Sequence, residues 1–359
     1  MQILILPDKF KGFLTAQQVC TAIENGIRAI KPNVKITAIP LADGGEGTLD
    51  VFIQNNNAKT IKTTVHDPLF RPINSKFGYI NETAYIEMAQ ASGLQLLQPT
   101  EINCYFTTSI GTGELIKSAI DIGAKKIIMG IGGSATNDGG IGMATALGYK
   151  FLDKNGNELQ PIGKNLINIH HIDNTNYVSK NITIQVACDV NNPLYGTTGA
   201  VQVYAAQKGA NLQERHTLEA GLINLAKIIQ QDLQINVNNL KFAGAAGGLG
   251  AGAFAFLNAS LEQGTELIFN NLNLADKLQT TDLIFTGEGK IDEQTLHGKL
   301  VKGIIDIAND IPVICMCGIL DLKNPERLGA KHIVSLDSNI PDQMELLQIA
   351  TAKVFQKYL

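Results

Sequence analysis

Short apolar runs alternate with amphipathic segments at both ends of the chain. Residues 2–6 form a continuous apolar run of the kind that parallel sheets bury on both faces. The capping-box pattern Thr15-x-x-Gln18 then precedes a series of apolar positions at helical spacing. The same alternation of strand and helix patterns recurs over residues 35–56 and 282–358. Two early and three late strand patterns therefore predict a doubly wound parallel sheet built from both ends of the chain.

The middle of the chain follows a different pattern. Residues 60–90 contain short alternating runs separated by turns, which is typical of antiparallel strands. Mixed helix and strand patterns follow as far as about residue 280. We therefore predict an α/β fold in which residues 1–70 and 281–359 form the doubly wound domain. Residues 71–280 are expected to form a second, inserted mixed α/β domain, with the active site in the cleft between the two.

This predicted topology has a chemical consequence. Open α/β sheets bind ligands at the carboxyl ends of their strands, where the strand order reverses. With the strand order 2-1-3-4-5, the first and third strands are neighbours at that point. The segments that follow them, residues 7–12 and 287–292, are expected to be loops that meet in space.

Composition and charge exclude several classes of function. The chain has 359 residues, of which 45% are hydrophobic and 17% are charged, as in ordinary globular proteins. Its net charge of −4 argues against a nucleic-acid-binding surface. The five cysteines include no C-x-x-C pair, and their odd number gives no disulfide framework. Cys315 and Cys317, in an apolar strand-like run, are interpreted as small buried apolar residues. Without an apolar run of membrane-spanning length or a signal-peptide pattern, we expect a cytoplasmic protein with no membrane partner.

Glycines and acidic residues occur together in segments that follow apolar strand patterns. There are five such segments, at residues 7–12, 41–48, 130–140, 187–193 and 285–292. None contains a Walker A motif. Glycine amides can hold phosphate oxygens, carboxylates can hold Mg²⁺ or orient a hydroxyl, and a lysine can offset transferred charge. This combination favours phosphoryl transfer involving a metal-bound phosphate.

Two of the glycine-rich patterns allow a plainer interpretation. Residues 130–140 could simply form a tight strand-to-helix turn, but glycines on both sides of the segment 134–138 favour a ligand cradle. The pattern Gly248-x-Gly250-x-x-Ala253 fits a loose dinucleotide-binding fingerprint. No long strand pattern precedes it, so close packing of a helix is the preferred interpretation.

The chain resembles the ATP-dependent glycerate kinases of the bacterial type I family along essentially its full length. The resemblance is carried by separated motifs in one order, including "PDKFKGFLTA", "PLADGGEGT", "GIGGSATNDGG", "ACDVNNPL", "GAVQVYAAQKGA" and "FTGEGKIDEQT". It implies a flavodoxin-like domain interrupted by a second α/β domain, with ATP and Mg²⁺ as cofactors and D-glycerate as substrate. It implies 2-phosphoglycerate as the product in preference to 3-phosphoglycerate. Lys9 and Phe13 stand where the family usually has serine, so a hydroxyl contact is not carried over there.

Site roles follow from the segments and the resemblance together. Lys11 is expected to stabilise the transferred charge, Asp189 to act as base or to orient the hydroxyl, and Asp292 to complete the catalytic set. Asp43 and Asp292 are the expected Mg²⁺ ligands. Substrate or nucleotide contacts are expected from the same segments, at Asp8, Lys9, Asp43, Gly44, Gly45, Glu46, Gly132, Gly133, Ser134, Asn137, Asp138, Gly139, Gly140, Asn191, Gly287, Glu288 and Gly289.

Alternatives to this interpretation stay open at the level of sequence. A non-catalytic regulator could bind a sugar acid or a nucleotide through the same glycine-rich segments. An oxidoreductase could use the Gly248 region for NAD. The sequence does not decide which segment meets ATP and which meets glycerate. It also leaves the oligomeric state open, with a homodimer as one option.

Overall fold

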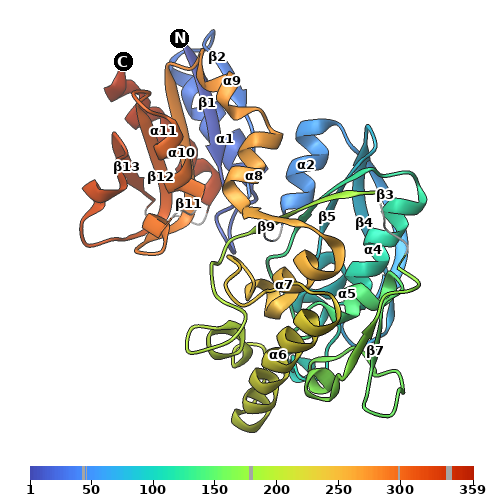
Figure 1. Cartoon of the computed structure of the whole chain (residues 1–359). Coiled ribbons are helices and arrows are strands. Elements are labelled where there is room, and N and C mark those ends of the chain that lie inside the picture. Colours follow the sequence, from blue (N-terminus) through green and yellow to red (C-terminus); the bar gives the residue numbers. More distant parts are fainter. Residues whose placement is uncertain (43–44, 46, 178–180, 298–299, 337–341) are drawn as a thin grey trace. The chain divides into compact units, whose positions relative to one another are not determined.

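The computed structural model describes residues 1–42, 45, 47–177, 181–297, 300–336 and 342–359. The chain divides into two compact units (Figure 1). Unit 1 consists of Met1–Asp43 and Thr265–Leu359, and unit 2 consists of Gly44–Gly264. Along the part of the chain that is described, no helix combines the length and apolar character needed to cross a membrane.

Unit 1 contains a five-stranded parallel sheet. Its strands are β1 (Gln2–Pro7), β2 (Lys35–Ala38), β11 (Leu283–Asp292), β12 (Val313–Asp321) and β13 (His332–Ser335). They lie in the order β13-β12-β11-β1-β2, which is 2-1-3-4-5 when the strands of this unit are counted along the chain. In Figure 1 the blue β1 and the orange β11 are neighbours although they come from opposite ends of the sequence. The predicted flavodoxin-like order is confirmed.

Helices cover both faces of this sheet. They are α1 (Ala16–Ile30), α8 (Gly264–Asn271), α9 (Leu274–Leu278), α10 (Leu300–Ile307) and α11 (Gln343–Tyr358). The predicted capping box starts α1, because the Thr15 hydroxyl accepts a hydrogen bond from the Gln18 amide. Successive side chains of β12 point to opposite faces of the sheet. Met316 therefore packs with α1 and α11 on one face, and Cys315 packs with α10 on the other.

The predicted burial of Cys315 and Cys317 is confirmed. All five are buried free thiols. Cys315 and Cys317 pack in the apolar layer beneath α10, and burial raises the pKa of the Cys317 thiol to about 12. Such thiols are unreactive at neutral pH and fill space as small apolar side chains.

Unit 2 is built around a six-stranded mixed sheet in the order β10-β9-β6-β5-β4-β3. These strands are β3 (Lys59–His66), β4 (Pro72–Ile80), β5 (Thr83–Glu87), β6 (Lys126–Gly130), β9 (Thr183–Cys188) and β10 (Ser260–Gln263). The strands β3, β4 and β5 pair in antiparallel fashion, as residues 60–90 predicted, and the remaining pairs are parallel. A small separate sheet pairs β7 (Lys150–Leu152) with β8 (His171–Asp173).

The helices of unit 2 pack against this sheet and against one another. They are α2 (Thr48–Asn56), α3 (Ala89–Ser92), α4 (Ile110–Asp121), α5 (Ile141–Ala146), α6 (Leu212–Asp232) and α7 (Ala245–Leu257). Short helical segments of other types occur in both units: η1 (Leu94–Leu96), η2 (Pro99–Glu101), η3 (Gly163–Asn168), η4 (Val201–Ala205), η5 (Thr295–His297) and η6 (Pro325–Leu328).

The unit boundaries differ from the expected ones at residues 70 and 280. The segment that contains α2 and β3 belongs to unit 2 because its partners are there. Phe52 of α2 stacks on Tyr85 of β5 with ring centroids 4.6 Å apart, and β3 pairs along its length with β4. In the same way, α8 and α9 belong to unit 1, where Phe269 of α8 lies against Gly303 of α10.

The expectation that residues 287–292 form a loop is wrong. They continue β11, with Glu288 opposite Cys317 and Asp292 opposite Asp321 on β12. The composition resembles that of a loop, but the neighbouring strand supplies the backbone hydrogen bonds that keep the segment extended. The glycines and acids of this segment are therefore held on a strand.

Candidate functional site

Two neighbouring parallel strands of unit 2, β6 and β9, end side by side. Gly130 at the end of β6 lies opposite Ala187 of β9. The residues that follow both strands line one cavity of about 250 Å³. Four residues singled out by the sequence meet there: Gly132, Gly133, Ser134 and Asp189. Their position agrees with the general location of ligand sites at the carboxyl ends of parallel strands.

The glycines of residues 130–140 serve two different purposes. Gly133 is exposed, adopts φ +75°, and has no atom nearer than 3.6 Å to the position that a β-carbon would take. By contrast, a β-carbon on Gly139 would lie 2.3 Å from Leu225 Cδ2 of α6, and one on Gly140 would lie 3.3 Å from the Gly252 Cα of α7. The first glycines thus border the cavity, whereas the last two permit close packing.

Asp138 lies in the same segment, but its carboxylate is fully buried and satisfied internally. It accepts hydrogen bonds from the amide and hydroxyl of Ser109, both at 2.7 Å, and from the amides of Gly140 and Gly142. Burial raises the pKa of Asp138, and these hydrogen bonds oppose the rise. The residue ties the start of α5 to the start of α4 and is not among the residues that line the cavity.

Asn137 is also fully buried away from the lining of the cavity. Within the described part of the chain, neither polar atom of its side chain has a hydrogen-bond partner. An unsatisfied buried amide opposes folding, and such groups concentrate where function constrains the sequence. The unpartnered Asn137 side chain therefore supports a role for residues 130–140 beyond reversing the direction of the chain.

Lys208 is the principal residue of this cavity that the sequence reasoning missed. Only 5% of its surface is exposed. Its Nζ donates hydrogen bonds to the Ser134 hydroxyl at 2.5 Å and to the Thr136 carbonyl at 2.9 Å. Burial lowers the pKa of Lys208 to about 8, although nearby Cys104 and Asp138 favour the charged form. The available signal was a single charged residue, Lys208, in the otherwise uncharged segment "VQVYAAQKGA".

A second group of predicted residues meets in unit 1. The Asp8 amide donates to the Gly287 carbonyl at 2.9 Å, and a β-carbon on Gly289 would lie 2.9 Å from the amide nitrogen of Lys11. The expected meeting of residues 7–12 with residues 287–292 is therefore confirmed. The Asp8 carboxylate accepts a hydrogen bond from the Lys9 amide at 2.7 Å, and Lys11 itself is exposed.

Thr295 contacts the Glu288 carboxylate and the backbone of Asp292. The Thr295 hydroxyl donates to Glu288 Oε1 at 2.6 Å and accepts from the Asp292 amide at 3.2 Å. Asp292 also accepts from the Gln294 amide, and its Oδ2 lies 3.7 Å from the Nζ of Lys290. Gly287 has a packing role, since a β-carbon there would lie 2.1 Å from the Met316 carbonyl oxygen.

Of the two expected Mg²⁺ ligands, Asp292 ends β11 and Asp43 lies outside the described residues. Among those that are described, no three His, Cys, Asp or Glu side chains form a group that could hold a metal ion. Mg²⁺ in phosphoryl-transfer sites is commonly held by one or two carboxylates together with substrate phosphates. The carboxylates of Asp292 and Glu288 supply hard oxygen atoms of the kind that Mg²⁺ requires, and Thr295 contacts the Glu288 carboxylate and the Asp292 backbone amide.

The segment 41–48 includes Asp43, Gly44 and Glu46, all outside the described residues. Of the predicted contacts there, Gly45 accepts a hydrogen bond through its carbonyl from the Thr48 hydroxyl. Glu87, which the sequence reasoning missed, is buried at the end of β5 and accepts from the Gly47 and Leu49 amides at 3.1 Å each. Burial raises the pKa of Glu87, which fastens the start of α2 to the sheet.

Two further sequence candidates have structural partners. The Asn191 side-chain oxygen accepts a hydrogen bond from the Phe242 amide at 3.3 Å. At the loose dinucleotide pattern, a β-carbon on Gly248 would lie 3.0 Å from the Cα of Gly139, and one on Gly250 would lie 2.3 Å from the Phe242 carbonyl oxygen. These glycines allow close approach of backbones, which favours packing over dinucleotide binding.

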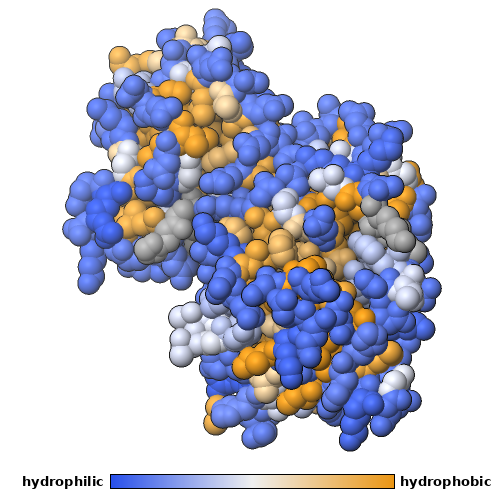
Figure 2. All heavy atoms as spheres, viewed as in Figure 1, coloured by the Kyte–Doolittle hydropathy of each residue, from blue (hydrophilic) through white to orange (hydrophobic). Residues whose placement is uncertain are grey.

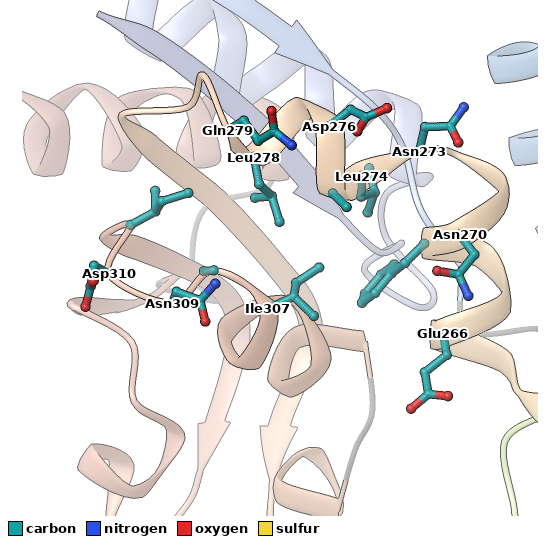
Figure 3. Close-up of a pocket in the computed structure, with 14 residues that line it drawn as sticks. Glu266, Asn270, Asn273, Leu274, Asp276, Leu278, Gln279, Ile307, Asn309 and Asp310 are labelled. Carbon is teal, nitrogen blue, oxygen red and sulfur yellow. The ribbon is translucent and has the colours of Figure 1, made fainter.

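Unit 1 holds a larger cavity, of about 710 Å³, between α8, α9 and the end of α10 (Figure 3). Its rim carries the acidic residues Glu266, Asp276 and Asp310, and no basic residue within the described ranges lines it. Apolar residues appear in this region in Figure 2, among a mainly hydrophilic visible surface. The cavity adjoins the amino ends of β11 and β12, away from Asp292, and its charge does not suit an anionic ligand.

Several known proteins similar to this chain are named as glycerate kinases. The sequence model described as "Glycerate kinase family" matches residues 3–357. The chain is 43% identical over 344 residues to "Glycerate 2-kinase" of Escherichia coli (strain K12), covering 94% of this chain and 89% of the relative. It is 41% identical over 352 residues to "Glycerate kinase" of Bacillus subtilis (strain 168), covering 96% and 92%.

A solved structure agrees with these sequence matches. It is the crystal structure of a Salmonella typhimurium LT2 protein assigned as glycerate kinase 2, with a TM-score of 0.90 and 39% sequence identity. The match covers 100% of this chain and 98% of the other. Because a family model spans residues 3–357 and relatives exceed 40% identity over most of their length, the chain belongs to the glycerate kinase family.

Proposed function

We propose that the protein transfers the γ-phosphoryl group of ATP to D-glycerate and releases ADP and 2-phosphoglycerate. The observation that carries this proposal is the cavity at the ends of β6 and β9. There a buried ammonium, glycine amides and the Asp189 carboxylate border one small space in a member of the glycerate kinase family. The name of the Escherichia coli relative, glycerate 2-kinase, supports the C2 hydroxyl as the acceptor rather than the C3 hydroxyl.

The proposed chemistry is a direct in-line transfer. The C2 hydroxyl oxygen attacks the γ-phosphorus, and the bond to the oxygen that bridges the β- and γ-phosphates breaks. The hydroxyl proton passes to Asp189, which lines the cavity on an exposed turn and can release it to solvent. Since no covalent intermediate with the protein is needed, the protein contributes mainly through positioning and charge.

Residues of unit 1 are proposed to serve the nucleotide phosphates. Lys11 would offset the charge of the transferred group, beside Asp8, Lys9 and Gly289. Mg²⁺, when bound together with ATP, supplies neutralisation of the phosphate charge. Asp292 and Glu288 would hold it, with Asp43 as a further proposed ligand.

A coupled assay of ADP release tests the proposal. D-glycerate with Mg²⁺ and ATP should give ADP at a rate that saturates with glycerate, and omission of glycerate should abolish it. A binding signal for glycerate without any glycerate-dependent ADP would instead identify a regulator. Hydride transfer to or from a nicotinamide cofactor, with no ADP release, would identify an oxidoreductase.

A further inference from the structure

We infer that Lys208 and the adjoining Gly132–Ser134 edge form the subsite for the carboxylate of the acceptor acid. This inference deepens the proposed function and rests on it for the identity of the acid. Glycerate is thereby placed in the cavity of unit 2, against Lys208, a residue that the sequence did not single out. Lys208 thereby becomes the group that selects an acid as phosphoryl acceptor.

The first support is the incomplete satisfaction of a buried cation. A lysine ammonium has three N–H donors, and the structure uses two of them, on Ser134 and Thr136. No carboxylate lies within ion-pairing distance of Lys208 among the residues described. Burying an ammonium without a counter-ion is unfavourable, so the fold keeps a charge that a bound anion would stabilise.

The second support is the charge of the cavity as a whole. Among the described residues, its lining contains one lysine, Lys208, and one acidic residue, Asp189, and the other lining residues are uncharged. Glycerate carries a single negative charge and two hydroxyl groups. One ammonium therefore matches its carboxylate, and Asp189 can accept a hydrogen bond from a hydroxyl. A triphosphate carries several negative charges, which one lysine beside a carboxylate does not balance.

The third support is size. Pockets for drug-sized ligands usually have volumes of about 300–1,000 Å³. The cavity of about 250 Å³ lies below that range, which suits a three-carbon acid better than a whole nucleotide. Gly133 also leaves the edge beside Ser134 open, so a carboxylate oxygen can approach the backbone closely.

The decisive variant is Lys208→Met, which keeps much of the side-chain volume and removes the charge. Lys227→Met is its matched control, because Lys227 is exposed on α6 and does not line the cavity. Equilibrium binding of D-glycerate without ATP is measured by calorimetry, and the KM values for both substrates are measured in the ADP assay. A hydrogen-bonded charge contact contributes about 1.5–3 kcal/mol, so glycerate binding should weaken by roughly 10- to 150-fold. The KM for ATP should change by less than about threefold.

The other outcomes separate this inference from the proposed function. If wild type releases ADP with glycerate but Lys208→Met raises only the KM for ATP, or neither KM, the carboxylate subsite is wrong and the kinase stands. If wild type binds glycerate through Lys208 but releases no ADP, the subsite stands and the kinase proposal fails. Lys208→Gln provides a second variant if Lys208→Met does not fold. It keeps N–H donors without the charge and should also weaken glycerate binding, whereas unchanged binding in a folded variant overturns the inference.

Discussion

The ammonium nitrogen of Lys208 lies 2.5 Å from the hydroxyl oxygen of Ser134, within the glycine-rich segment that follows β6. The contact joins the chain after η4 to the end of a strand far away in sequence. It also holds a cation in a buried position, where desolvation lowers the pKa of Lys208 to about 8. Stability and ligand binding should therefore depend on pH in opposite directions at this residue.

We expect the stability of the ligand-free protein to rise with pH at Lys208. Its pKa in the folded state is about 8, below the ordinary value of 10.5, so between these values the unfolded chain binds more protons. Each step up in pH across that window then favours the folded state. Melting temperatures of wild type and Lys208→Met should be compared from pH 7 to pH 10. As the pH rises, the melting temperature of wild type should increase relative to that of the variant. A constant difference across this range would show that Lys208 is not a buried charged group.

Glycerate binding should weaken as the pH rises above about 8. Only the protonated ammonium attracts a carboxylate, so the dissociation constant for D-glycerate should rise above about pH 8. Among the described residues, Asp189 and Tyr204 also line the cavity, and Asp138 and Cys104 are buried near it without lining it. Burial raises the pKa of Tyr204, so its hydroxyl loses its proton only at higher pH. Calorimetric titrations at several pH values test this. The pH dependence should disappear in Lys208→Gln, and its persistence there would assign it to another group.

Gly133→Ala should impair substrate binding while leaving the fold intact. Gly133 adopts φ +75°, where an alanine is strained by about 1–2 kcal/mol, but nothing blocks the added methyl group. Gly156→Ala is the matched control, because Gly156 adopts φ +83°, has equally open surroundings and does not line the cavity. Both variants should lose similar stability, and only Gly133→Ala should raise a substrate KM. If both variants lost stability but kept the wild-type KM and kcat, the segment would be an ordinary turn.

Asp189→Asn should reduce turnover far more than stability. The residue is exposed at the end of β9, so replacing its carboxylate by an amide of the same shape disturbs little packing. Loss of a positioned base typically slows a reaction by about 10²- to 10⁴-fold. Steady-state kcat and the melting temperature should be measured together. A kcat within a few-fold of wild type would exclude Asp189 as the base.

Much of the fold could be predicted because its signals are local. The apolar runs of β1, β11 and β12 and the capping box at Thr15 arise from neighbouring residues. The number of strands indicated a doubly wound sheet, and the order 2-1-3-4-5 is a common one for such a sheet. The extension of β11 through Asp292 could not be predicted in this way. Its glycines and acids are typical of a loop, and a pairing partner distant in sequence keeps them in a strand.

The candidate site was predictable to a similar extent. Composition indicated Gly132, Gly133, Ser134 and Asp189, because glycines and acids after apolar strands mark carboxyl-end segments. Composition does not report burial, so Lys208 was missed. Its environment arises only when the chain after η4 packs against the segment that follows β6.

Phosphorus NMR of the complete reaction is the most direct test of the central claim. Protein, D-glycerate, Mg²⁺ and ATP are incubated, and the new phosphomonoester signal is recorded with proton coupling. Transfer to the C2 hydroxyl should give a doublet, since that phosphorus couples to the single proton on C2, together with the signals of ADP. A triplet from the two protons on C3 would contradict the proposed position of transfer. Unchanged ATP with no phosphomonoester signal would contradict the proposed kinase activity itself.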